Sequence, residues 1–429
     1  MAYILLLFYT ALLYIRPQDI YAVPGEVPAF SMLTVAAGFL FFFAMVTRKL
    51  NPQSLLGSPQ NKLIVLFLVA IALSHLAQFR FMGAWQNILF FINVVVLFLL
   101  ITCVLDTHQK IKGYITLLVL LTLFLAYQGI LQSETGTAWG GHPPFIHNGE
   151  VRVQWIGTFS DPNDFALALV IMVPPLLFIV VSKRVFFQKG LAVFLLFVFI
   201  YAIFLTRSRG GYLSLAGVFF LFFAMRYRGI KFAIMGMIAL SSILMLAPPR
   251  LMASLTGGSF VDYGRVDAWS AGLQMIKSHP LFGVGRGRFD ELHDLAAHSA
   301  FVQVLAETGI LGSFCWIGLF YITLRDIYQT HQFKSLGQLE DPYDMDETGV
   351  SLLIALFGFL LGAFFLSKAY TVLPFILIAT WVATARQIER ENEGLKFRFK
   401  RQDTAHILGL VIGLIVFLYI SVRFFWSAK

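Results

Sequence analysis

Long apolar runs, separated by short charged patches, restrict the fold of this chain more than any other feature. The runs are about 16 to 24 residues long, and about 20 helical residues cross the roughly 30 Å hydrocarbon layer of a membrane. Backbone amides find no water in that layer, so each run has to be a helix that pairs them internally. The sequence therefore predicts an all-α polytopic integral membrane protein.

We expect about 12–13 transmembrane helices. The predicted spans are residues 3–15, 29–46, 63–78, 88–105, 114–131, 163–182, 190–206, 211–225, 232–247, 301–324, 350–367, 371–386 and 405–422. The first run is short, but no basic residues precede it and no small-residue cleavage site follows it, so we interpret it as a span, not a signal peptide. Residues 350–386 would form either one hairpin or a re-entrant pair.

The composition agrees with a membrane protein and argues against a nucleic-acid partner. Hydrophobic residues make up 58% of the chain and charged residues 13%, whereas soluble domains carry roughly 25% charged residues. The net charge is +9, but the basic residues stand in short clusters at the ends of apolar runs, as in the positive-inside pattern. Cys103 and Cys315 both fall inside predicted spans, so we expect no disulfide framework and no metal site built from them.

The distribution of Lys and Arg predicts the orientation. With the N-terminus in the cytoplasm, the inner connections hold 19 of these residues and the outer ones 13, five of them in the loop 248–300. Long loops contribute little to the rule, so loops 132–162 and 248–300 are expected outside, in the periplasm of a Gram-negative host. The expected organisation is N-terminal helices (1–131), a core with both loops (132–325), a cytoplasmic acidic linker (326–349) and C-terminal helices (350–429).

The first outer loop ends in the segment RVQWIGTFSDPNDF (152–165). Ser160 or Asp161 followed by Pro162 predicts a capped helix start, with proline in the first helical position. Arg152 and Trp155 lie in a loop over the membrane, where they would suit a lipid headgroup or a sugar.

A tight outer turn, TRSRGGY (206–212), carries Arg207 and Arg209 against the positive-inside trend. Its glycines allow close approach of the backbone to a ligand, and the N-terminus of the next helix favours an anion. Arginine offers paired donors to phosphate. The alternative is that both side chains only reach the membrane interface.

The loop 248–300 contains an amphipathic helix and a glycine-rich turn. Apolar residues at 266, 269, 273 and 276 predict a helix over 265–276 that lies on the membrane or on the bundle and ends at His279-Pro280. The following GVGRGR (283–288) resembles a dinucleotide fingerprint only superficially, because no strand precedes it. We expect a flexible turn over a headgroup, with Arg286 and Arg288 as phosphate contacts.

His298 opens the run at 301–324. A histidine in the first turn of a helix feels the positive end of the helix dipole, which favours the neutral imidazole that a general base needs. The alternative is polar packing at the membrane interface. His142, His147, His279 and His293 are competing histidines on the same face.

Four segments, taken in order, resemble the O-antigen ligase / O-antigen polymerase superfamily of bacterial envelope proteins. They are GTFSDPN (157–163), TRSRGGYL (206–213), GRVDAWSAGLQMIKSHPLFGVGRGRF (264–289) and HSAFVQVLAETGILG (298–312). The resemblance implies an inverting, metal-independent glycosyltransferase without a cofactor. Its partners would be membrane lipids, a glycan on undecaprenyl diphosphate, and a lipid, protein or glycan acceptor at the periplasmic face of the bacterial inner membrane.

The resemblance also implies roles for single residues. Arg207, Arg209 and Arg265 would hold the diphosphate, and His298 would deprotonate or orient the acceptor hydroxyl, so that His298 and Arg265 are the expected catalytic residues. Further expected donor contacts are Arg152, Arg286 and Arg288. The outer face lacks an Asp-rich cluster in the sequence, so arginines would stabilise the leaving group.

Three alternatives stay open at this stage. A polymerase of the same superfamily would use another lipid-linked glycan as its acceptor. A lipid-linked-glycan transporter or flippase would need polar residues within the bilayer, and Ser74-His75 and Tyr127-Gln128 are the few present. A non-catalytic scaffold is the third.

Overall fold

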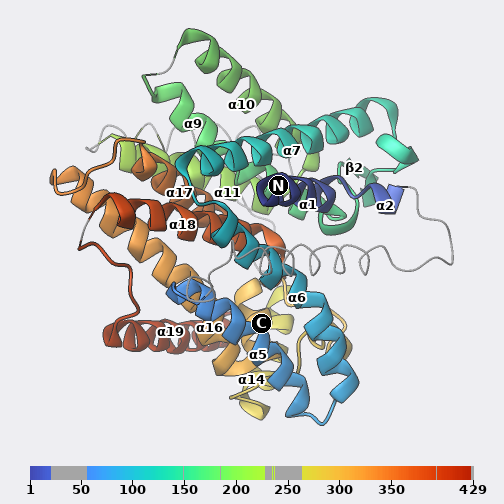
Figure 1. Cartoon of the computed structure of the whole chain (residues 1–429). Helices are drawn as coiled ribbons and strands as arrows, with labels where there is room; N and C mark the ends of the chain where they lie inside the picture. Colours follow the sequence, from blue (N-terminus) through green and yellow to red (C-terminus); the bar gives the residue numbers. More distant parts are fainter. Residues whose placement is uncertain are drawn as a thin grey trace. The chain divides into compact units, whose positions relative to one another are not determined.

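The computed structural model describes residues 1–20, 56–147, 149–183, 185–227, 234, 236, 263–392 and 394–426 (Figure 1). Nine helical segments in this part are long and apolar enough to cross a membrane. The protein is an all-α, multi-pass membrane protein. The predicted spans 29–46 and 232–247 lie outside the described residues, and every other predicted span falls on a helix.

The chain forms two compact units that alternate along the sequence. The first unit consists of Met1–Ala44, Val104–Thr256 and Asp341–Gly362, and the second of Met45–Cys103, Gly257–Glu340 and Ala363–Lys429. Helices of the first unit are α1 (Ala2–Ile15), α2 (Pro17–Ile20), α7 (His108–Thr135), α8 (Pro162–Val170), α9 (Val173–Val181), α10 (Phe186–Thr206), α11 (Arg209–Arg226) and α17 (Met345–Ala363, whose last residue belongs to the second unit). Helices of the second are α5 (Pro59–Leu76), α6 (Phe81–Val104, whose last residue belongs to the first unit), α14 (Tyr263–Ser278), α15 (Phe289–Leu292), α16 (Ala300–Ser335), α18 (Val372–Glu391) and α19 (Arg401–Trp426).

The predicted span 163–182 is two helices, α8 and α9, with a break at residues 171–172. Pro174 and Pro175 explain the break, because each lacks the N–H that would continue the helix from α8. Both prolines stand in the first turn of α9, where no such bond is required. The two helices together still form a segment long and apolar enough to span. The region 350–386 contains two separate helices, α17 and α18, each also long enough.

In the first unit, α10 packs on α7, α8 and α9, and α8 packs on α11 (Figure 1). Small residues let the neighbouring helices approach: a Cβ on Gly358 of α17 would lie 2.5 Å from the Val218 side chain of α11. Close approach at small residues is a common way to pack helices in lipid. The only described strands, β1 (Phe145–His147) and β2 (Glu150–Arg152), form an antiparallel hairpin in the loop after α7.

Trp155 is a core residue of the first unit, which corrects the prediction that it faces a headgroup or sugar. Its side chain is 2% exposed, and its indole N–H donates to the carbonyl oxygen of Tyr14 at 3.2 Å. Burial of the large ring stabilises the loop by hydrophobic contact, and the bond to α1 satisfies the polar nitrogen. Arg152, three residues earlier, stays half-buried.

In the second unit, α16 is the central helix and packs on α5, α14, α18 and α19. The helix continues to Ser335, into the stretch 326–349 where the sequence predicts a solvated linker. Buried polar contacts at Asp326 support this continuation, because Gln60 donates to its Oδ2 at 3.1 Å.

A break at Gly309, where φ is 62°, divides α16 near its start. Residues 280–288, which we call the glycine turn, pair with the open backbone there. Val284 and Gly285 donate their N–H groups to the carbonyl oxygens of Ala306 and Glu307 at 3.0 and 2.9 Å. In the other direction, the N–H groups of Ile310 and Leu311 donate to the carbonyl oxygens of Pro280 and Leu281. The turn therefore satisfies the polar groups that the break exposes.

Replacing Gly283 by alanine is expected to destabilise the protein more than the same change at Gly287. Both have positive φ, 71° and 78°, which costs an alanine about 1–2 kcal/mol at either position. A Cβ on Gly283 would also collide with the backbone of Glu307, whereas nothing lies within 4 Å of one on Gly287. Thermal unfolding in detergent should show a melting temperature several degrees lower for Gly283→Ala. Equal losses would mean that the turn is not packed on α16.

Candidate functional site

The turn between α10 and α11, residues 206–211, presents two arginines, and we call it the arginine turn. Arg207 ends α10 in the left-handed conformation, with φ 49°. Ser208 caps α11, because its hydroxyl accepts from the N–H of Gly211 at 3.0 Å. Arg209 is then the first residue of α11, and both arginine side chains are exposed. Local capping therefore directs the chain so that both guanidinium groups stand at the helix N-terminus.

Arg152 joins the arginine turn from the loop between α7 and α8. Its Nε donates to the carbonyl oxygen of Thr206 at 3.0 Å, and its Nη2 donates to Oδ1 of Asn163 at 3.1 Å. The same Oδ1 accepts from the Ser208 hydroxyl at 2.7 Å. Asn163 lies in the first turn of α8, which Asp161 caps as predicted, by accepting from the Asn163 N–H. One amide oxygen thus connects the loop, α8 and the arginine turn.

The electrostatics of this group favour an anion. Burial lowers the pKa of Arg152, the carboxylates of Asp161 and Glu150 act against this, and the charge on Arg209 lowers the pKa further. Arg207 and Arg209 form no ion pair among the residues that the structure describes. Arg152, Arg207 and Arg209 therefore gather positive charge at a helix N-terminus, an arrangement that suits phosphate oxygens.

Arg265 lies on α14 of the second unit, which confirms the predicted helix over 265–276 and its end before His279. Its guanidinium carbon stands 5.4 Å from the centre of the Phe365 ring. The neighbouring Phe364 contacts both Trp269 of α14 and Phe301 of α16. This aromatic group fixes α14 against the start of α16 and positions Arg265 there.

His298 lies two residues before α16, not in its first turn as predicted. Ser299 is the N-cap, although its side chain makes no capping hydrogen bond, and the helix begins at Ala300. His298 itself is half-buried and has a φ of 49°. A non-glycine residue in this region is uncommon, and histidine is one of the types that adopt it more readily. Such a backbone outlier motivates a functional hypothesis.

Arg286 and Arg288 are bonded within the second unit. Arg286 donates to Oδ1 of Asn87 at 2.8 Å, and its guanidinium carbon lies 3.8 Å from the centre of the Phe90 ring. Burial lowers the pKa of Arg286, and the charges of Tyr370 and Glu307 oppose that effect. Arg288 donates to the carbonyl oxygen of Val284 and to Glu291. Both arginines therefore hold the glycine turn in place.

Four residues that were not expected at the candidate site from the sequence lie around Arg286, namely His75, Asn87, Glu307 and Tyr370. His75 contacts the Arg286 carbonyl oxygen through Nε2 at 3.0 Å, and Glu307 accepts weakly from the Phe289 N–H at 3.4 Å. An available signal was that His75 and Glu307 are ionisable residues inside apolar runs, where such residues are rare. Asn87 and Tyr370 carried no such signal.

The structure thus brings Arg152, Arg207 and Arg209 together in the first unit. Arg265, Arg286, Arg288 and His298 lie in the second, around α14, the glycine turn and the start of α16. Among the described residues, no three His, Cys, Asp or Glu side chains are grouped in a way that could hold a metal ion.

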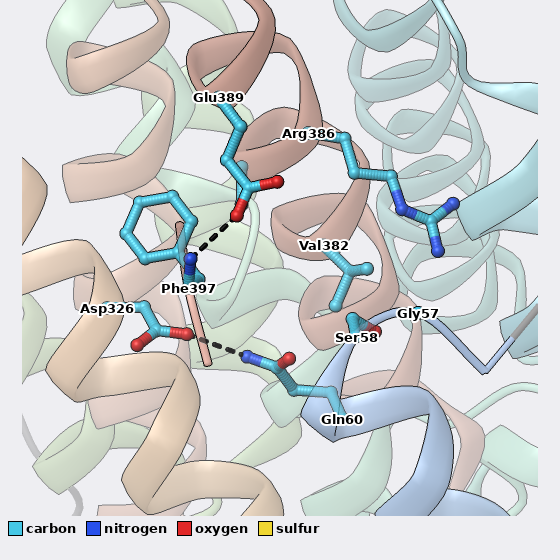
Figure 2. Close-up of a pocket in the computed structure, with 9 residues that line it drawn as sticks. Gly57, Ser58, Gln60, Asp326, Val382, Arg386, Glu389 and Phe397 are labelled. Carbon is cyan, nitrogen blue, oxygen red and sulfur yellow. Dashed lines mark hydrogen bonds between the residues drawn. The ribbon is translucent and has the colours of Figure 1, made fainter. Parts of the chain in front are cut away.

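A polar pocket with a volume of about 150 Å³ lies in the second unit and contains none of these residues. Figure 2 shows Gln60 bonded to Asp326, and Glu389 bonded to the backbone N–H of Phe397. Its lining residues come from the start of α5 and the end of α18, whereas His75 is near the end of α5 and Tyr370 precedes α18. The pocket is therefore at the opposite ends of these helices from the glycine turn.

Comparison with known proteins supplies one match. Residues 191–317 match the family model described as O-antigen ligase. The matched segment contains the arginine turn, Arg265, the glycine turn and His298, while Arg152 precedes it. A comparison with curated proteins found no match.

Proposed function

We propose, from the match of residues 191–317 to the O-antigen ligase family model, that the protein acts as a member of the O-antigen ligase/polymerase superfamily. The protein transfers a glycan from undecaprenyl diphosphate to an acceptor at the periplasmic face of the bacterial inner membrane. The orientation rests on the excess of Lys and Arg in the short inner connections. A ligase would use a lipid or protein acceptor.

The observation that carries the proposal is the group of Arg152, Arg207 and Arg209 at the start of α11. Breaking the bond between sugar and diphosphate leaves negative charge on the diphosphate oxygens. Donors already positioned for that charge stabilise the transition state without reorganisation. Arg207 and Arg209 are exposed and form no ion pair within the described part of the chain, so they are our first candidates for the donor diphosphate. Arg152 supports them by donating to the backbone of the same turn at Thr206.

In the second unit, His298 and Arg265 would act on the reacting groups. The acceptor hydroxyl oxygen attacks the anomeric carbon as the bond from that carbon to the diphosphate oxygen breaks. His298 takes the hydroxyl proton, and Arg265 stabilises charge on the leaving diphosphate. Undecaprenyl diphosphate departs, and the attack from the opposite side inverts the anomeric centre. Arg286 and Arg288, whose guanidinium groups are bonded within the protein, would act through the glycine turn.

A transfer assay tests this function. Purified protein would be incubated with undecaprenyl-diphosphate-linked glycan and separate acceptors (a lipid A core, a hydroxyl-bearing protein, or a second lipid-linked glycan), each with and without EDTA. We expect EDTA-resistant transfer to one acceptor class, and a second lipid-linked glycan as that acceptor would identify a polymerase. Loss of all transfer with EDTA would contradict metal independence. Movement of the donor across vesicle membranes without transfer to any acceptor would identify a transporter instead.

A further inference from the structure

Glu307 is a buried acid at the break in α16. Its side chain is 1% exposed, although it lies in a segment apolar enough to span a membrane. The carboxylate accepts from the backbone N–H of Gly287 in the glycine turn, and its Oε1 accepts from the N–H of Phe289, the residue directly after the turn. The backbone of the same residue accepts from Gly285. Glu307 therefore contacts the glycine turn through both its backbone and its side chain.

Arg286 and Tyr370 are the polar side chains next to this acid. Tyr370 is 6% exposed; burial raises its pKa, and the negative charge of Glu307 raises it further. The Arg286 guanidinium carbon lies 5.1 Å from the centre of the Tyr370 ring, and Glu307 acts on Arg286 as an opposite charge. Arg286 Nε and Glu307 Oε2 are buried and have no hydrogen-bond partner among the described residues. The nearby opposite charges therefore offset part of the cost of burying both groups, together with the hydrogen bond from Arg286 to Asn87.

Compensation of this kind makes the two charges interdependent. A buried ion loses its hydration, and removing one partner leaves the other uncompensated, whereas removing both can be nearly neutral. Arg286 is also a point at which the glycine turn is held, because His75 and Ser74 bond its backbone carbonyl and N–H groups. Neutralising Glu307 or Arg286 alone should therefore loosen the turn.

The first segment of α16, residues 300–308, connects Glu307 to the proposed catalytic residues. The break at Gly309 separates it from the rest of the helix. His298 precedes its first residue by two positions. At Val302 the segment contacts α14, which carries Arg265, so closely that a Cβ on Gly272 would lie 2.6 Å from the Val302 side chain. Movement of this short segment would displace both His298 and Arg265.

We propose that Glu307 is a positioning residue that, through its hydrogen bonds at the glycine turn and the nearby charge of Arg286, fixes residues 300–308 and thereby holds His298 and Arg265 in place for transfer. The catalytic part of this inference rests on the proposed function. The fixing of the segment does not, and it is measurable without substrate.

The test is a double-mutant cycle with Glu307→Gln, Arg286→Met and the double variant, each in lipid nanodiscs. Hydrogen exchange of the amides of residues 300–308 should accelerate about tenfold or more in each single variant and return near wild type in the double variant. The turnover number should fall by roughly tenfold to 10²-fold in the single variants, with the acceptor KM unchanged, because misplacement affects the transition state. The double variant should recover most of this rate.

Asp290→Asn is the matched control. Asp290 is an acid in α15, two residues after the glycine turn, and its side chain is exposed, so its loss should leave exchange and turnover unchanged. Unaltered exchange in Glu307→Gln would overturn the proposal, and so would a double variant as impaired as the worse single one. If the wild type transfers no glycan, the proposed function fails, while the exchange data still decide whether the pair fixes the segment.

Discussion

Replacing His298 by alanine is expected to lower the rate of glycan transfer by roughly 10²–10⁴-fold, the usual contribution of a general base. His298 stands at the start of α16, half-buried and in a left-handed backbone conformation. Alanine has no basic nitrogen to accept the proton, so the acceptor hydroxyl stays protonated and is a weaker nucleophile. Donor affinity should change little, because the diphosphate is proposed to bind arginines. Steady-state transfer rates and donor-binding measurements on the purified variant check both points.

His279→Ala is the control for this prediction. His279 follows α14 directly, and its Nδ1 lies 2.9 Å from the Ser278 hydroxyl. It touches neither the glycine turn's arginines nor α16 through any side-chain bond between described residues, so transfer should stay near the wild-type rate. Retained transfer in a folded His298→Ala variant would rule out the general-base assignment. A similar loss in His279→Ala would indicate a general disturbance of the loop.

The double substitution Arg207→Gln/Arg209→Gln is expected to lower kcat/KM by roughly 10²–10⁴-fold. Each hydrogen bond to a charged group contributes about 1.5–3 kcal/mol, and the variant loses two such donors. Glutamine keeps the polarity and most of the length of the side chain, so the loss of kcat/KM would measure the contribution of the positive charge. In the wild type, the rate should fall as salt rises, because ions screen exposed charges; in the variant, that dependence should weaken. Transfer kinetics at several salt concentrations measure both effects.

Arg226→Gln provides the matched control, since Arg226 is an exposed arginine at the other end of α11. Its loss removes the same charge from the same helix without touching the proposed donor site. Near wild-type kcat/KM is expected. An equal loss at Arg226 would mean that net charge alone supports transfer, and unchanged kinetics in the double variant would remove the arginine turn from the mechanism.

Short-range signals in the sequence predicted the structure well. Asp161 and Pro162 start a helix as expected, and the helix carrying Arg265 ends before His279. These features depend on hydrogen bonds and backbone limits within a few residues, so neighbouring residue types decide them. The break between α8 and α9 follows from Pro174 and Pro175 by the same reasoning, but the apolar pattern concealed it. The start of α16 was misplaced by two residues at His298, because an apolar run does not mark its own cap.

Contacts between segments far apart in the chain were predicted less well from the sequence. The residue types of the candidate site were expected from resemblance and motif, but the bonds of Arg152 to Thr206 and Asn163 join segments far apart in the chain. Trp155 was expected to face a ligand and is buried instead. No local pattern shows which face of a loop packs inward, because that depends on the helices that surround it.

The sequence by itself determined that the chain crosses a membrane as helices, since the hydrocarbon layer permits unpaired backbone polar groups nowhere along a span. It also determined the turn that carries Arg207 and Arg209 and the helix that carries Arg265. Only the tertiary structure decided that the glycine turn fills the break in α16 and that the buried Glu307 carboxylate accepts from the N–H of Phe289 directly after that turn. The physical reason is that buried polar groups need partners. A buried charge or an open backbone is tolerated only beside a partner, and the fold brings those partners together from distant parts of the chain.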